Sequence, residues 1–320
     1  MGTGRGPRGL IIAAVALLML APSGGCPAEL SVTPDEVIPG GIARVTLSGA
    51  CEHAEGDIDG QALRFFRDGP EGRVVSLIGI DLDEPQGERV VAVRCNGWAG
   101  RAGLRVRRHE FPKEELTVAD QYVRPSPAEQ ARAAKEASRL DRLWVAASPE
   151  RLWRGEFQRP AEGPLGTAFG LRRIFNGQPR SPHSGIDIRA RRGTPVVAAN
   201  TGCVVLRGDL FFSGHTVVLD HGLGLYTGYL HLSEYRVSDD ELVEKGQVIG
   251  LVGATGRVTG PHLHFSARLG GARVDPWQLI TEDFEGSAAN AGSSEDDADD
   301  VTRMGVGQRS CKRGRAETRK

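Results

Sequence analysis

Two histidines separated by one leucine stand in the segment GPHLHF, residues 260–265. Successive side chains of an extended strand point to opposite faces, so His262 and His264 would share one face while Leu263 and Phe265 point the other way. Two imidazoles on one face can bind a metal ion or transfer protons. The plainer interpretation of an isolated H-x-H is a pair of half-exposed strand histidines, so the rest of the chain has to decide.

Six of the eight histidines fall between positions 183 and 264. In PHSGIDI the proline and glycine favour a loop that runs into a strand, where alternation turns Asp187 away from the core and toward His183. A neutral imidazole and a carboxylate are both good zinc ligands. In YTGYLHL, alternation puts Tyr229 and His231 on one face and the two leucines on the other. These fragments together predict a polar site in one β-rich region.

The other histidines carry weaker signals. His215 and His221 lie near DHG, which is typical of a turn at a strand end. His53 and His109 are isolated and are interpreted as ordinary surface or hydrogen-bonded side chains.

Length and composition limit the function classes. The 320 residues allow two domains, and the net charge of -1 indicates no polyanionic partner. Basic residues are scattered rather than interleaved with aromatic ones, so no nucleic-acid surface is expected. No later segment has the length and apolarity of a transmembrane helix, and the oligomeric state is not predicted.

The first 28 residues resemble an export signal. Arg5 and Arg8 precede an uncharged apolar run from Leu10 to Ala21, which is too short to span a bilayer. Cleavage near Cys26 would release the chain, although SGGC could instead be a poor lipobox that makes Cys26 a lipidated first residue. We therefore expect an exported protein, periplasmic or associated with the cell envelope.

Export changes how the cysteines are interpreted, because disulfides persist in oxidising compartments. Cys51 and Cys95 both lie in the early β-rich region and are predicted to form the one structural disulfide, the alternative being two reduced strand cysteines. Cys203 is interpreted as a small core residue, and Cys311 lies in the C-terminal tail.

The spacing of β-prone runs and turn residues predicts an all-β fold with antiparallel sheets. Residues 29–112 are expected to form an immunoglobulin-like β-sandwich and residues 161–281 an antiparallel β-domain. The linker, 113–160, should contain a helix over 127–145, because SPAE is a capping box. Its apolar stripe, which is expected to pack on a neighbouring domain, consists of Ala134, Ala137, Leu140 and Trp144.

The C-terminal segment, residues 282–320, is rich in glycine, serine and charged residues. Such a composition offers little apolar surface to offset the entropy of ordering. We expect a disordered tail, dispensable for folding and catalysis from about Glu282 onward.

The segment from Gly166 to Pro276 resembles the lysostaphin-type zinc metalloendopeptidases, which cut the peptides of bacterial cell walls. The resemblance lies in GTAFGLRR, HSGIDI, GTPVVAANTG, VVLDHGLGLYTGYLHLS, KGQVIGLVGATGRVTGPHLHF and the closing VDP, which occur in the family's order. It implies hydrolysis of peptidoglycan peptides with one Zn²⁺ per catalytic domain.

Carried over residue by residue, the resemblance implies that His183, Asp187 and His264 bind the metal. His231 and His262 would be the catalytic histidines, and Tyr229 a further contact to the transition state. Which histidine is the general base stays open. The preferred bond is a D-alanyl cross-link rather than a glycine bridge.

Two alternatives remain open. Some domains of this kind regulate or bind other wall enzymes without catalysis, and this chain could also be held closed by its own N-terminal domain or linker. A wall-associated structural protein, whose sandwich binds a partner, is the second alternative.

Overall fold

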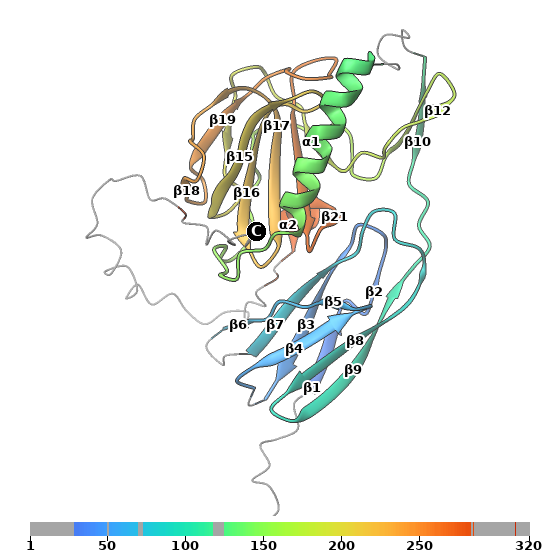
Figure 1. Ribbon diagram of the computed structural model, residues 1–320, viewed down its shortest axis with the longest axis vertical. Coiled ribbons are helices and arrows are strands. Elements are labelled where there is room, and N and C mark those ends of the chain that lie inside the picture. The colour runs from blue at the N-terminus through green and yellow to red at the C-terminus, as the bar shows by residue number, and fades with distance from the viewer. Residues whose placement is uncertain are drawn as a thin grey trace, which may run out of the picture.

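The computed structural model describes residues 29–49, 51–69, 73–117, 125–282, 284 and 311, arranged as two β-rich parts joined by a linker (Figure 1). The predicted signal peptide, with Cys26, and most of the predicted tail lie outside the described residues. Among those residues no helix is both long and apolar enough to cross a membrane. The all-β fold class is confirmed, with two helices in the described chain.

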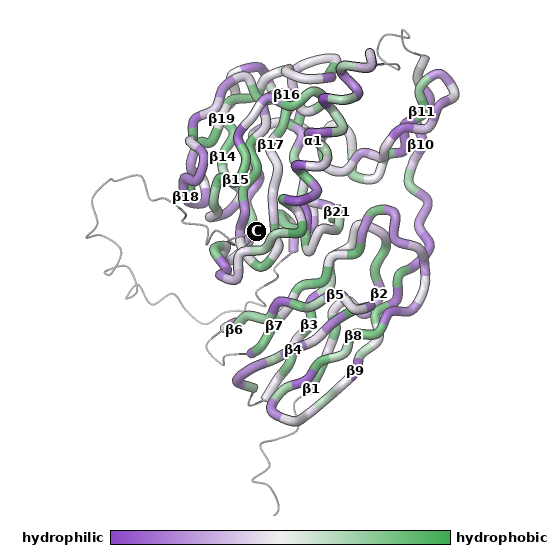
Figure 2. Tube along the Cα trace, in the orientation of Figure 1, coloured by the Kyte–Doolittle hydropathy of each residue, from purple (hydrophilic) through white to green (hydrophobic). Residues whose placement is uncertain are grey.

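The N-terminal part is a sandwich of two sheets whose inner faces share one apolar core (Figure 2). One sheet has the order β1-β3-β7-β6, and these strands span Glu29–Thr33, Ile42–Ser48, Arg73–Gly79 and Phe66–Asp68. The other has the order β2-β9-β8-β4-β5, with strands Glu36–Val37, Trp98–Val106, Gly87–Cys95, Ala54–Ile58 and Gln61–Ala62. From Ala43 in β3 and from Val91 in β8, buried residues alternate with less buried ones, as one buried face per sheet requires.

The predicted bond between Cys51 and Cys95 is present in this sandwich. Cys95 ends β8, and the ladder of β4 with β8 places it opposite Ala54, close to Cys51. Their Cα atoms are 5.8 Å apart, inside the range that a disulfide spans. The disulfide therefore links the segment before β4 to the end of β8, where these two strands are already paired.

The linker contributes one strand and one long helix. Strand β10, Lys113–Leu116, pairs in parallel with β11, Arg172–Phe175, which also pairs with β12, Gln178–Pro179. Helix α1, Pro127–Val145, begins at the predicted capping box, where Ser126 and Glu129 satisfy each other's backbone N–H groups.

Helix α1 lies along the C-terminal sheet (Figure 1). Leu140, Leu143 and Trp144 pack against a buried cluster of that sheet, with Trp144 edge-on to Tyr226. Ala134 and Ala137 are exposed, so the predicted packing stripe is wrong at its N-terminal half. Polar contacts take over there, since the Glu136 carboxylate accepts a hydrogen bond from the Phe211 backbone N–H at 2.8 Å.

The C-terminal part is built on one large sheet with the order β13-β20-β17-β16-β15-β18. These strands span Gly185–Ile188, Leu263–Leu269, Leu225–Tyr235, Gly214–Gly222, Gly202–Leu210 and Leu242–Val243. Shorter strands flank the sheet, namely β14 (Pro195–Val197), β19 (Val248–Val252) and β21 (Ala272–Val274). All pairings within it are antiparallel, as expected.

A short helix that the sequence analysis did not anticipate closes this part. Helix α2, Pro276–Thr281, follows the VDP motif. Asp275 caps it by accepting a hydrogen bond from the Trp277 N–H at 2.9 Å, and Pro276 suits the first helical turn. Pattern analysis missed it because six residues are too few to show a helical period.

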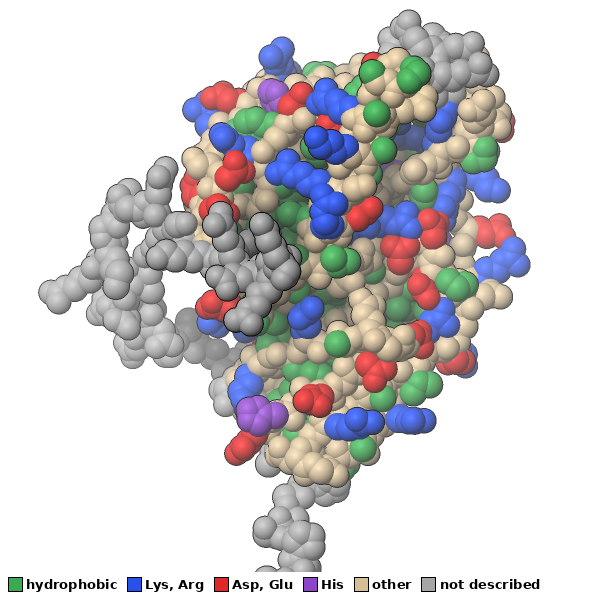
Figure 3. Space-filling model, in the orientation of Figure 1, with side chains coloured by type: hydrophobic (Ala, Val, Ile, Leu, Met, Phe, Trp, Pro, Cys, Tyr) green, Lys and Arg blue, Asp and Glu red, His purple; other side chains and the backbone are tan. Residues whose placement is uncertain are grey.

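The two parts are docked through apolar and ionic contacts. Ile42 and Leu82 of the sandwich belong to the same buried cluster as the core of the C-terminal sheet. Arg273 of β21 reaches across to Asp81, at 2.5 Å, and to Asp83, at 2.7 Å. Figure 3 shows acidic and basic side chains interspersed over one face of the molecule.

The Asp81–Arg273 pair should make the free energy of unfolding depend on pH in the acid range. Burial alone would raise the pKa of Asp81, but its bonds to Arg273 bring that pKa from 3.8 down to about 2. Because the pKa of Asp81 is lower in the folded than in the unfolded protein, its charged carboxylate stabilises the folded state above about pH 4. This contribution is lost as the pH falls through 2. Urea unfolding of the parent and of Asp81→Asn should differ by about 1–2 kcal/mol at pH 6, and the gap should shrink between pH 4 and 2. A gap that stays constant over this interval would contradict the assignment.

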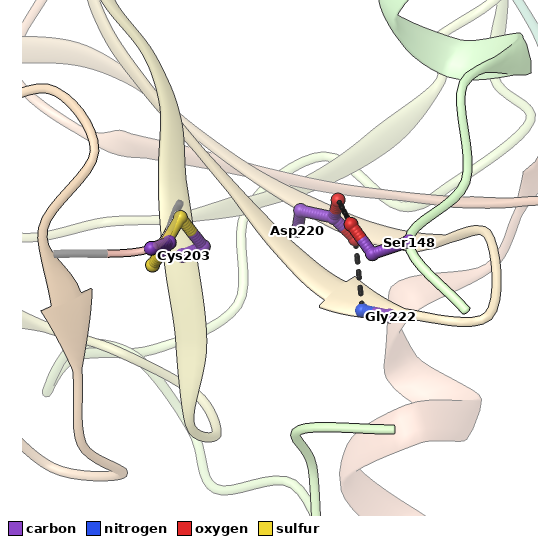
Figure 4. The surroundings of a disulfide bond; sticks show 5 residues. Ser148, Cys203, Asp220 and Gly222 are labelled. Carbon is purple, nitrogen blue, oxygen red and sulfur yellow. Dashed lines mark hydrogen bonds between the residues drawn. A yellow bond between two sulfur atoms is a disulfide. The ribbon is translucent and has the colours of Figure 1, made fainter. Parts of the chain in front are cut away.

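The C-terminal segment returns to the sheet at two described points. Phe284 is buried in the main core, and Cys311 forms a disulfide with Cys203 of β15. Figure 4 shows Cys203 on its strand, near Asp220, which accepts a hydrogen bond from Ser148 at 2.7 Å. The prediction that Cys51–Cys95 is the one disulfide is therefore wrong, because the fold brings Cys203 to a position that Cys311 reaches from 108 residues away.

Removing this tether is expected to destabilise the protein, contrary to the expectation that the tail is dispensable. A crosslink that closes a loop of about 100 residues restricts the conformations of the unfolded chain. This restriction stabilises the folded protein by up to about 4–5 kcal/mol. Cys311→Ser, and truncation after Ile280, should therefore both lower the melting temperature. Unreduced peptide mapping should recover Cys203 joined to Cys311. Unchanged melting of both variants would show that the tail adds nothing to stability.

Candidate active site

Three side chains predicted to bind a metal lie together at the β13 edge of the large sheet. Asp187 of β13 and His264 of β20 are direct cross-strand partners, which puts both side chains on one face. His183 comes from the loop before β13. Its Nε2 lies 3.0 Å from Oδ1 of Asp187 and 2.9 Å from Nδ1 of His264, and this Nδ1 lies 3.0 Å from the same oxygen. The donor atoms converge on one point.

This donor set fits zinc, which binds imidazole nitrogen and carboxylate oxygen and needs deprotonated ligands. Burial would raise the pKa of Asp187, but the adjacent His183 and His264 hold it well below its usual range. Burial also lowers the pKa of His264, which favours the neutral ring. The Nδ1–H of His183 can donate to the carbonyl oxygen of Ala168, 2.9 Å away, leaving Nε2 for the metal. Three protein donors leave a fourth zinc position for water, as in catalytic sites.

Two further histidines face the same space. Nδ1 of His231 lies 2.9 Å from the carbonyl oxygen of Thr255, and Nδ1 of His262 lies 2.9 Å from that of Gly260. Each carbonyl favours a proton on Nδ1, so each Nε2 is free to accept one. Burial, with the neighbouring His264, lowers the pKa of His231 to about 3. The rings of His231 and His262 lie 5.0 Å apart between centroids. Each side chain therefore offers its Nε2 as a proton acceptor, and burial favours the neutral ring of His231.

Tyr229 does not reach this site, so the prediction of a transition-state contact is wrong. Its side chain is fully buried beside Phe265, and its hydroxyl accepts hydrogen bonds from the Ala199 N–H at 2.8 Å and from Thr227 at 3.0 Å. Strand alternation fails because His231 has a φ of 64°, in the left-handed region. This local turn directs His231 to the site while Tyr229 stays in the core.

Comparison with known proteins identifies the domain that carries these residues. Residues 181–276, which include all five histidine and aspartate positions of the site, match peptidase family M23. A crystal structure of a Pseudomonas aeruginosa protein assigned to peptidase M23 is 31% identical, and the match covers 76% of this chain and 94% of that one with a TM-score of 0.63. The chain belongs to peptidase family M23. The predicted family resemblance is thereby confirmed.

Curated relatives of this M23 chain share a shorter stretch. The DD-carboxypeptidase/endopeptidase Mpg of Neisseria meningitidis is 45% identical over 94 residues, which are 29% of this chain and 22% of Mpg. The peptidoglycan DD-endopeptidase ShyA of Vibrio cholerae is 44% identical over 112 residues, 35% of this chain and 26% of ShyA. The chain thus spans about a quarter of the length of these relatives.

The remaining histidines of the M23 domain lie away from the candidate metal site. His221 is fully buried and contacts the Thr201 carbonyl oxygen at 2.8 Å and the Thr227 hydroxyl at 2.7 Å, and burial lowers its pKa to about 4. His215 stacks on Tyr235, with 4.9 Å between ring centroids. Both belong to β16 and pack within the sheet. DHG lies at the end of this strand, where the sequence analysis expected a turn.

The M23 site opens into a groove of about 1520 Å³. One wall comes from β11 and the loop before β13, and another from the loops that contain Phe212 and Arg257. Linker residues Glu114, Pro125 and Glu129 complete the lining. A groove of this size can hold an extended peptide across the candidate metal site.

Sequence reasoning missed the arginines of this groove. Arg173 and Arg257 both line it, although they are 84 positions apart and belong to no metal or catalytic motif. Their only signal was their presence inside the family-like segments GLRR and ATGRVTG. Nothing in a single sequence indicated that the two segments face the same space.

Proposed function

We propose that this M23 chain is a zinc-dependent endopeptidase that hydrolyses peptide cross-links of bacterial peptidoglycan. The observation that carries the proposal is the convergence of His183, Asp187 and His264 in an open groove beside His231 and His262. Relatives named peptidoglycan DD-endopeptidases share this domain and support the substrate class.

The metal would be held by the three converging donors. A zinc ion bound there lowers the pKa of a water molecule and polarises a carbonyl group. His183 and His264 supply imidazole nitrogens, and Asp187 supplies one negative charge that offsets part of the cation's charge.

The two other histidines would move the protons. Peptide hydrolysis needs a base to take a proton from the attacking water and an acid to protonate the leaving amine. His231 and His262 each offer a free Nε2 fixed in direction by a carbonyl at Nδ1. His262, with a side chain 19% exposed, is the more accessible from the groove, and its Nε2 lies 3.7 Å from Oδ1 of Asp187. One ring would accept the proton and, once charged, stabilise the oxyanion or release the proton to the amine.

The proposed compartment is the cell envelope. Two disulfides in the described chain suit an oxidising environment, and the predicted signal at residues 1–28 would deliver the protein there. Peptidoglycan, the substrate in the relatives' names, lies outside the cytoplasm. Lipidation at Cys26 remains the alternative to simple secretion.

The bond we propose is the D-alanyl cross-link rather than a glycine bridge, a choice supported by the relatives' names. Incubation of the full-length protein with purified cross-linked peptidoglycan should convert dimeric muropeptides to monomers, seen by mass spectrometry. Release of glycine-terminated fragments, or no release in the presence of zinc, would contradict this assignment.

One observation favours a second candidate function, an enzyme whose own linker limits substrate access to the active site. Linker residues Glu114, Pro125 and Glu129 line the groove, so the linker lies where it could influence the entry of a peptide. The complete set of metal-binding and proton-transfer residues counts against a purely non-catalytic regulator. Stoichiometric zinc, measured by elemental analysis, without any wall cleavage would favour the restricted or regulatory function.

A further inference from the structure

Positive charge gathers along one side of the groove. Arg173 comes from β11, and Arg257 comes from the loop between β19 and β20. Burial lowers the pKa of Arg257, and the like charges of Arg180 and Arg173 lower it further. Both Arg173 and Arg257 line the same groove, so a negative ligand that reaches both guanidinium groups would be stabilised.

Arg257 is held in place but has no acidic partner in the part of the chain that the structure describes. Its guanidinium lies over the ring of Phe212, 4.3 Å from the centroid, and its backbone N–H donates to the Phe212 carbonyl oxygen at 3.0 Å. Within the described residues no hydrogen bond or ion pair engages this guanidinium. Stacking occupies the face of the group and leaves its N–H edge, the edge that binds a carboxylate with two parallel hydrogen bonds.

The contacts of Arg173 indicate that this side of the groove suits a carboxylate. Its Nε lies 3.6 Å from a carboxylate oxygen of Glu114, and a second nitrogen donates to the Thr167 hydroxyl at 3.2 Å. This Nε is buried and has no hydrogen-bond acceptor among the described residues. Glu114 is a linker residue whose side chain is 45% exposed, so its carboxylate contacts Arg173 only weakly.

We propose that Arg257 and Arg173 form a carboxylate-binding subsite of the groove, and that the peptides this chain binds for cleavage carry a free carboxylate there. The inference rests on the proposed endopeptidase function and extends it to substrate selection. A glycine bridge has no side-chain carboxylate, so such a subsite would favour acidic cross-linked peptides over neutral ones.

The test compares one cross-linked peptide in two forms, with free carboxyl groups and with the same groups converted to carboxamides. Charge-assisted hydrogen bonds discriminate by about tenfold to a hundredfold. The zinc-loaded full-length protein should prefer the carboxylate form by that factor in kcat/KM, mainly through KM. Arg257→Gln and Arg173→Gln should bring the ratio toward one, whereas Arg257→Lys should keep part of it.

A matched control is Arg191→Gln, because Arg191 is an exposed arginine of the same domain that does not line the groove. This variant should keep the full preference. Equal rates on both peptides by the parent protein, or a preference that survives Arg257→Gln and Arg173→Gln, would overturn the subsite.

Binding of the same two peptides, measured by calorimetry, separates the subsite from the proposed activity. If neither peptide is cut but the carboxylate form binds more tightly and the preference depends on Arg257, the subsite stands and the endopeptidase function fails. If both are cut and bound equally well, the endopeptidase function stands and the subsite fails.

Discussion

His264→Ala, His183→Ala and Asp187→Ala are each expected to lose bound zinc and all measurable cleavage of peptidoglycan. Each substitution removes one of the three donor atoms that converge in the described part of the chain, and these lie within 3.0 Å of one another. Two donors hold zinc much more weakly than three, and the metal supplies the charge that activates water. The measurements are zinc by elemental analysis and release of soluble muropeptides, made on the same preparations.

His215→Ala is the matched histidine control, since His215 lies on the same sheet but outside the groove. It should keep both zinc and activity. Cleavage at the parent rate by the three metal-site variants would overturn the metallopeptidase proposal. Retention of zinc by one of them would remove that residue from the ligand set.

His262→Ala and His231→Ala are expected to keep their zinc and to lose activity by about 10²–10⁴-fold. Loss of a proton-transfer group or of an oxyanion-stabilising group typically costs this much in rate. Neither ring is part of the converging donor triangle, and each is oriented by a backbone carbonyl oxygen rather than by the metal-site residues. These variants should therefore keep the zinc content of the parent while their initial cleavage rates fall. In His264→Ala both quantities should fall together.

A fall in zinc content of His262→Ala equal to that of His264→Ala would show that both histidines of GPHLHF bind the metal. Circular dichroism and melting temperature would identify a folding defect, which is the particular risk for His231 because its side chain is buried. His231→Gln, of similar size, keeps the local packing and tests the role of the ring itself.

Local patterns in the sequence were enough to predict the residues of the proposed site and the type of fold that carries them. Alternation in GPHLHF placed His262 and His264 on one face, and both line the groove. Alternation in GIDI turned Asp187 toward the same space, because β13 and β20 are regular paired strands. Such local rules hold wherever the backbone stays extended, and the Cys51–Cys95 bond was predictable for a similar reason, from two cysteines in one exported β-rich region.

Tertiary structure decided what depended on an irregular backbone or on contacts distant in sequence. The positive φ of His231 separates it from Tyr229, and no periodic pattern contains that turn. Cys311 joins Cys203 from 108 positions away, and composition alone described its surroundings as a tail. Arg173 and Arg257 share a groove only because β11 and the loop before β20 are brought to one side of the sheet. Loop closure over such distances is set by the whole fold, so the residues themselves carry no local signal of it.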